Sequence, residues 1–108
     1  MMRKRIEREN LEILQDFCGD LLELIIVEQG YPIDVEEEFD FLLRYIYKNI
    51  VELWFGGADP SPAELERKLR SIRSRHEERL QVLLSYLVSR FARARSEEIA
   101  RRIKWDES

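Results

Sequence analysis

The sequence predicts an all-α protein, an up-down bundle of three or four helices in which a long third helix projects. Three observations lead to this prediction: apolar residues recur every three or four positions, Gly and Pro clusters separate three such segments, and no window alternates for long enough to form a strand. With 108 residues, of which 44% are apolar, the chain is long enough for a single helical domain over residues 1–108 with a packed core.

The first helix is expected over residues 3–29. Gly30 accommodates the left-handed conformation that ends many helices, and Pro32 cannot continue one. The core positions of this helix follow a spacing of three and four residues, which places them on one face. They are Leu11, Leu14, Cys18, Leu21 and Ile25.

The second helix is expected over residues 35–55. Asp34 and Glu37 have the spacing of a capping box, and the acidic run around Glu37 lies where a helix N-terminus favours negative charge. Apolar and aromatic side chains occur on several faces of this segment, so we expect it to contact several neighbours. Gly56-Gly57 ends it.

The third helix is expected to be the longest, over residues 62–95. Ser61 is a favourable N-cap, Pro62 suits the first helical position, and Glu64 lies at the third. No Gly or Pro interrupts the segment that follows. Residues 97–105 form either a separate fourth helix or a continuation of the third.

The apolar stripe of the third helix is too long for the first two helices to cover. The third helix spans about 50 Å, against about 40 and 32 Å for the others. An external partner is therefore expected: first a second copy in a homodimer, otherwise a helical protein. A fourth helix folded back over the stripe is the alternative. The predicted interface residues are Leu80, Leu83, Leu87, Phe91 and His76.

Charge is distributed unevenly along the chain, although the net charge is only −4. Residues 9–59 hold 13 acidic and 2 basic side chains, net −11, whereas residues 67–104 hold 12 basic and 4 acidic side chains, net +8. The basic helix either packs beside acidic helices, in the same chain or a partner, or binds the phosphates of a nucleic acid. The candidate nucleic-acid-binding residues are Arg67, Arg70, Arg73, Arg75 and Arg79.

Catalytic and cofactor-binding residues are scarce. Cys18 and His76 are each the only residue of their type. A structural zinc site needs four Cys, His or carboxylate ligands, so none is expected, and a single cysteine cannot form a disulfide within the chain. No other metal site, no cofactor and no enzymatic activity are expected either, because the sequence offers no Gly-rich phosphate loop, no Glu–His di-iron motif and no Ser–His–acid set. A lone cysteine and the lack of an apolar stretch of about 20 residues indicate a cytoplasmic protein without a membrane segment. The absence of Thr and the abundance of Glu and Arg are typical of thermophiles.

Two local patterns resemble known families. Arg70 and His76, with five residues between them, resemble the Arg–His pair of the HEPN ribonucleases, which implies RNA cleavage by that pair. A 13-residue segment, 82–94, resembles a signature helix of the GINS replication-complex subunits, which implies a non-enzymatic part of a replicative helicase assembly. The matching residues are Ser85, Tyr86, Leu87, Arg90, Phe91 and Arg93.

Overall fold

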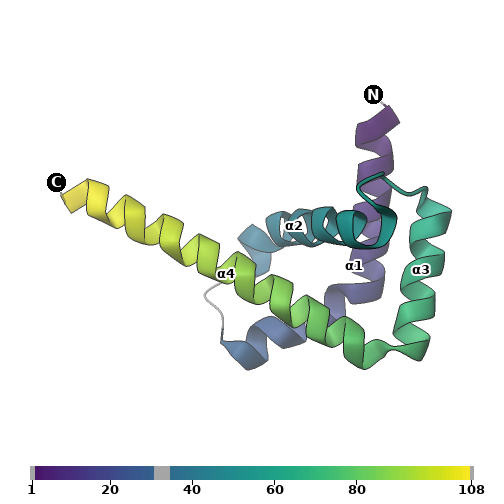
Figure 1. Cartoon of the computed structure of the whole chain (residues 1–108). Helices are drawn as coiled ribbons and strands as arrows, with labels where there is room; N and C mark the ends of the chain where they lie inside the picture. The colour runs from purple at the N-terminus through teal and green to yellow at the C-terminus, as the bar shows by residue number, and fades with distance from the viewer. Residues whose placement is uncertain (1, 31–34, 108) are drawn as a thin grey trace.

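The computed structural model is all-helical, as predicted (Figure 1). It describes the backbone of residues 2–30 and 35–107 and the side chains of residues 6–30 and 38–98. Within those ranges no strand occurs. The helices, in chain order, are α1 (Met2–Gln29), α2 (Val35–Phe55), α3 (Pro62–Arg75) and α4 (Glu77–Glu107).

The first two helices lie within one residue of their predicted bounds. Gly30 follows α1 with a φ of 65°, and Gly56 and Gly57 follow α2 with φ values of 65° and 91°. These positive angles are the left-handed backbone conformation in which glycine meets no steric penalty. The capping box predicted at Asp34 and Glu37 lies outside the described side chains.

The predicted continuous helix over residues 62–95 is wrong, because the helix breaks at His76. This residue has φ −138° and ψ 42°, outside the helical region. Its N–H still donates to the carbonyl of Ile72 at 2.7 Å, and its own carbonyl accepts from the N–H of Leu80 at 3.1 Å. Of the two alternatives for residues 97–105, the structure has the continuation, because α4 runs through this segment.

Charges on both sides of the break favour it. Arg73 and Arg75 lie in the last turn of α3, and Glu77 and Glu78 lie in the first turn of α4. Positive charge stabilises the C-terminal end of a helix dipole, and negative charge stabilises the N-terminal end. The switch from basic to acidic residues therefore stabilises two helix ends where neither Gly nor Pro is present.

α3 lies alongside α1, whereas α2 and α4 cross α1 at wide angles (Figure 1). α1 contacts α2, α3 and α4, and α4 also contacts both α2 and α3. The C-terminal turns of α4 extend past the other helices (Figure 1). The molecule measures 50 × 35 × 24 Å along its principal axes.

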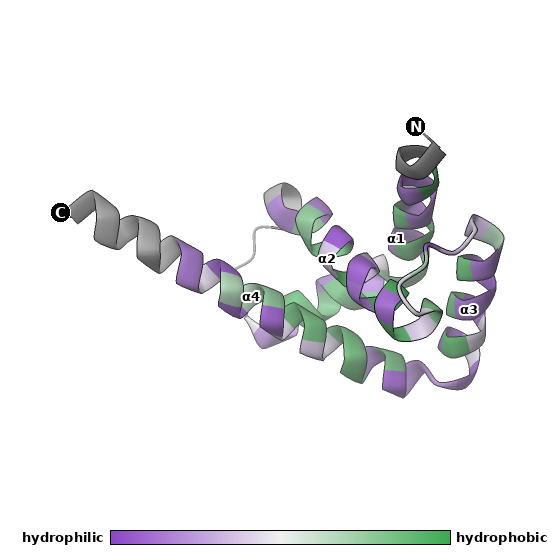
Figure 2. Ribbon diagram, turned by 45° about the horizontal axis from the view of Figure 1, so that its top comes forward, coloured by the Kyte–Doolittle hydropathy of each residue, from purple (hydrophilic) through white to green (hydrophobic). Residues whose placement is uncertain are grey.

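A single core receives side chains from every helix, and apolar residues line its inner faces (Figure 2). All five core positions predicted for α1 belong to it. On α4, the core also takes Leu84 and Val88, both fully buried, which lie outside the predicted stripe. The largest fully buried apolar side chains are Leu14, Leu22, Leu42, Ile46, Ile50, Leu65, Leu69, Leu80, Leu84 and Val88.

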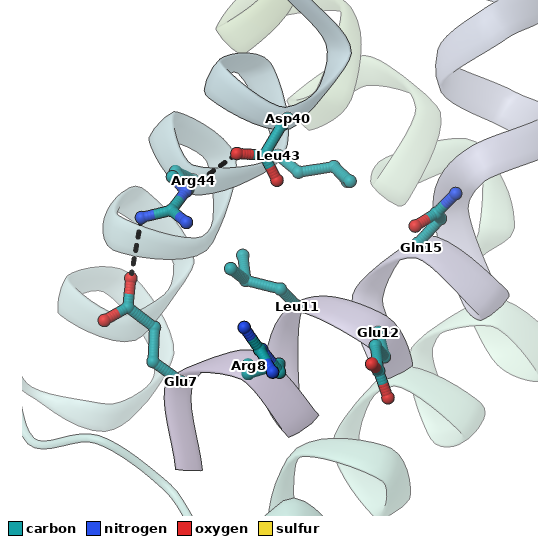
Figure 3. A pocket seen from close by; sticks show the side chains of 8 residues that line it. All are labelled: Glu7, Arg8, Leu11, Glu12, Gln15, Asp40, Leu43 and Arg44. Carbon is teal, nitrogen blue, oxygen red and sulfur yellow. Dashed lines mark hydrogen bonds and ion pairs between the residues drawn. The ribbon is translucent and has the colours of Figure 1, made fainter. Parts of the chain in front are cut away.

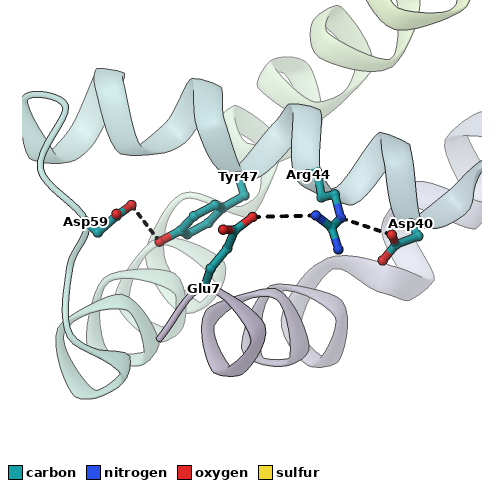
Figure 4. A network of polar contacts seen from close by, with 5 residues as sticks. All are labelled: Glu7, Asp40, Arg44, Tyr47 and Asp59. Carbon is teal, nitrogen blue, oxygen red and sulfur yellow. Dashed lines mark hydrogen bonds and ion pairs between the residues drawn. The ribbon is translucent and has the colours of Figure 1, made fainter. Parts of the chain in front are cut away.

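A buried polar network joins α1, α2 and the segment between α2 and α3. The Nδ2 of Asn10, a fully buried residue, donates to the Tyr47 hydroxyl at 2.9 Å and to the carbonyl of Pro60 at 3.0 Å. The Tyr47 hydroxyl in turn donates to Asp59 at 3.1 Å (Figure 4). Burial raises the pKa of Tyr47, so its hydroxyl stays protonated and remains a donor.

Candidate interaction surface

The residues predicted to form an interface lie mostly in the chain's own core. Leu80 and Leu87 are only 2% and 3% exposed, and Leu83 and Phe91 are partly buried against the core. His76 is exposed at the junction of α3 and α4. The break at His76 explains the difference, because it lets α4 pack across α1 and α2 and bury this stripe within the chain.

Two contacts fix α4 against α2. The rings of Tyr45 and Phe91 are 5.6 Å apart, with an interplanar angle of 49°. Four residues further along α4, Arg95 pairs with the largely buried Glu38 at 2.6 Å and with Glu98 at 2.8 Å. Both contacts lie on the side of α4 that faces the core, so the opposite side of the helix takes no part in the contact with α2.

Arg73, one of the candidate nucleic-acid-binding residues, binds within the chain. Its guanidinium donates to both carboxylate oxygens of Asp20, at 2.7 and 3.1 Å, and to the carbonyl of Phe17. The hydrogen bond from Arg73 holds the pKa of Asp20 below its usual range, and the same bond raises the pKa of Arg73. Arg73 therefore clamps α3 to α1.

The rest of the predicted basic cluster is divided between two helices. Arg70 pairs with Glu66 at 2.6 Å, one turn away on α3. Arg67 and Arg75 are exposed, and they line a shallow hollow of about 420 Å³ together with small side chains of α3. Arg79 belongs to α4, beyond the break.

α4 exposes a continuous face that combines apolar and basic side chains. Val82 is 70% exposed and Tyr86 is 57% exposed. Arg90 lies over the Tyr86 ring, 5.7 Å from its centroid. Among the described side chains, none of the arginines on this face makes an ion pair. The outward face of α4 is defined here as Arg79, Val82, Tyr86, Arg90 and Arg93.

α1 exposes a face of the opposite sign. Val27 is 75% exposed near its C-terminal end, beside Leu24 at 49%. The acidic residues on this face are exposed, and only Asp20, which lies among them, has an ion-pair partner within the described part of the chain. The outward face of α1 is defined here as Glu9, Glu12, Asp16, Glu23 and Val27.

No known protein family, curated protein or solved structure matches this chain. The surfaces must therefore be interpreted from their own chemistry. None of the helices, over the part that the structure describes, combines the length and the apolar character needed to cross a membrane.

A charged hollow of about 580 Å³ lies between α1 and α2 (Figure 3). Arg44 projects along its edge and binds Asp40 at 3.0 Å and Glu7 at 3.8 Å (Figures 3 and 4). The guanidinium is thus already engaged by two carboxylates. The lining is completed by Arg8, Leu11, Glu12, Gln15 and Leu43.

Among the described residues, no hydrogen bond or ion pair joins Arg70, His76 and Cys18, the residues considered for chemistry. Arg70 is engaged by Glu66, and no hydrogen bond joins it to His76 within the described residues. Cys18 is fully buried, and burial raises the pKa of its thiol to about 12. No group of three His, Cys, Asp or Glu side chains able to hold a metal ion occurs among the residues described.

Proposed function

We propose that this chain is a non-enzymatic assembly subunit that self-associates through the outward face of α4. The observation that carries the proposal is the pair of exposed side chains Val82 and Tyr86, one helical turn apart and surrounded by arginines without carboxylate partners. Tyr and Arg are enriched at protein interfaces, where a large ring can be buried while its hydroxyl remains hydrogen-bonded.

The proposed interface lies on a different side of the helix from the sequence-predicted one. One residue is equivalent to about 100° around a helix, so moving from Leu83 to Val82 moves from the core-facing side to the outward side. The residues of the GINS resemblance divide in the same way. Tyr86 and Arg90 lie on the outward face, and Leu87 is buried. Association through α4 also fits the subunit role which that resemblance implies.

Analytical ultracentrifugation tests the proposal. The mass of the wild-type chain should rise between about 10 and 500 µM, because association depends on concentration. A Val82→Ser/Tyr86→Ser variant should remain monomeric over this range. Leu53→Ser is the matched control, because Leu53 is 64% exposed but lies on α2. This variant should associate like the wild type. A monomeric wild type at every concentration would contradict the proposal.

Nucleic-acid binding is the second candidate function. It is favoured by five exposed arginines that have no ion-pair partner within the described region: Arg67, Arg75, Arg79, Arg90 and Arg93. Binding of a labelled RNA or duplex DNA should weaken steeply with salt above about 50 mM, because each phosphate contact releases counterions. Absent or salt-independent binding would exclude this function.

A further inference from the structure

We infer that the outward face of α4 binds the outward face of α1 in a second copy of this chain. This inference rests on the proposed self-association and adds the surface that α4 recognises. The contact is heterologous: each copy uses its basic helix toward one neighbour and its acidic helix toward another.

The charges that remain after internal pairing support this arrangement. Arg73 pairs with Asp20, and Arg95 pairs with Glu38. Each pair joins a basic helix to an acidic one, but the pairs use only a minority of the charges on those helices. Between Arg79 and Arg93 the outward face of α4 keeps three arginines and no carboxylate, with the exposed Glu97 one turn beyond, whereas the outward face of α1 keeps four carboxylates without an ion-pair partner among the described residues. Two surfaces of opposite sign attract and orient each other.

The apolar residues on the two faces match when the helices run antiparallel. Val27 lies at the C-terminal end of α1, and Val82 lies near the N-terminal end of α4. Eleven residues separate Asp16 from Val27, and eleven separate Val82 from Arg93. Each interval covers about 16 Å of helix. With Val27 against Val82, Asp16 therefore lies opposite Arg93 and Glu23 lies opposite Tyr86, whereas Glu12, one turn beyond Asp16, lies opposite the exposed Glu97.

The two faces cannot meet within one chain. α1 and α4 contact each other through their inner sides and share one core, so their outward faces point away from it in different directions. A two-fold contact between two α4 helices is also disfavoured. An antiparallel pair centred on Tyr86 would place Arg79 of one copy against Arg93 of the other, and like charges in contact oppose association.

The same arginines also suit a polyanion, but a second copy of the chain neutralises and covers more of the exposed surface. A nucleic acid would neutralise the outward face of α4 and would be repelled by the outward face of α1 in a chain of net charge −4. A second copy neutralises both faces and covers Val27, Val82 and Tyr86. A single pair of helices is smaller than a standard interface, so we expect a micromolar dissociation constant.

Charge reversal tests the inference. One variant carries Asp16→Lys/Glu23→Lys on α1, a second carries Arg90→Glu/Arg93→Glu on α4, and a third carries all four changes. Sedimentation should show monomers for the first two variants. The third should associate again, within about tenfold of the wild-type dissociation constant, because both faces have exchanged sign. The matched control is Arg67→Glu/Glu52→Lys, which reverses two exposed charges on α3 and α2 and should associate like the wild type.

The outcomes separate this inference from the proposed function. If the α4 variant is monomeric while the α1 variant associates normally, the outward face of α4 binds a surface other than the outward face of α1. That result overturns this inference and leaves the proposed function standing. Failure of the four-change variant to associate, with its helical content intact by circular dichroism, also overturns it. If the wild type stays monomeric and the α4 variant instead loses binding to labelled RNA, both proposals fall in favour of nucleic-acid binding.

Discussion

Replacing Leu84 by Ala tests which side of α4 faces the core. Leu84 is fully buried, whereas the adjacent Leu83, which the sequence pattern places on the stripe, is only partly buried. Truncating a fully buried Leu removes its transfer free energy and leaves a cavity, at a cost of about 3 kcal/mol. The partly buried Leu83 has less contact to lose, so the same truncation should cost about 1 kcal/mol.

The two substitutions are matched in chemistry and in helix propensity, so their difference reports burial. Urea denaturation followed by circular dichroism should give the larger loss for Leu84→Ala. The loss is large against a total stability of about 5–15 kcal/mol, and should lower the melting temperature by roughly 12 °C. Measurements well below the expected micromolar dissociation constant keep the chain monomeric. A Leu83→Ala variant as destabilised as Leu84→Ala would refute the observed orientation of α4.

Two further predictions concern α1. Asp20→Asn should destabilise the chain at neutral pH by up to about 1 kcal/mol, because Asp20 is largely exposed and its ion pair with Arg73 is screened by solvent. The pKa of Asp20 is lowered in the folded state, so this stabilisation is present above its unfolded pKa and is lost as pH falls through the folded value. The difference between wild type and variant, measured by urea denaturation, should shrink below about pH 4, and a constant difference would contradict the clamp. Cys18, whose pKa is about 12, should react with iodoacetamide at pH 8 at least ~10³-fold more slowly in the folded chain than in urea, and equal rates would contradict its burial.

Local signals were sufficient to predict where most helices begin and end. Gly30 and Gly56 adopt the positive φ angles that their positions at helix ends suggested. Ser61 has the extended backbone of an N-cap, and its hydroxyl accepts from the N–H of Glu64 at 3.3 Å. These features depend on residues within one helical turn, which a sequence pattern contains.

The break at His76 could not be predicted from breaker residues, because no Gly or Pro marks it. The only signal is the change from basic side chains at Arg75 to acidic ones at Glu77 and Glu78, and this charge pattern also suits exposed positions within one helix. Packing decides between the two, since a turn at His76 lets α4 bury Leu84 and Val88. Such a gain depends on contacts between distant segments.

Asn10 shows the same limit for a polar residue. It lies in a strongly charged stretch of α1, a pattern that indicates exposure to solvent, yet Asn10 is completely buried. Its partners, Tyr47 and the carbonyl of Pro60, are 37 and 50 residues away. A buried amide is tolerated only where such partners are present, and sequence spacing along one helix contains no information about them.

The break at His76 also bears on what the basic half of the chain can bind. A straight helix over residues 62–95 would place Arg67, Arg75 and Arg90 on one continuous helix over about 35 Å, a length suited to a polyanion. The observed turn places α3 along α1 and α4 across α1 and α2, which separates the hollow lined by Arg67 and Arg75 from the face that carries Arg90. What remains on α4 is a short surface with Val82 and Tyr86 among its arginines. Its length and its mixture of apolar and basic side chains favour binding to a helix of opposite charge over binding to an extended chain of phosphates. α1, with its acidic outward face, is such a helix.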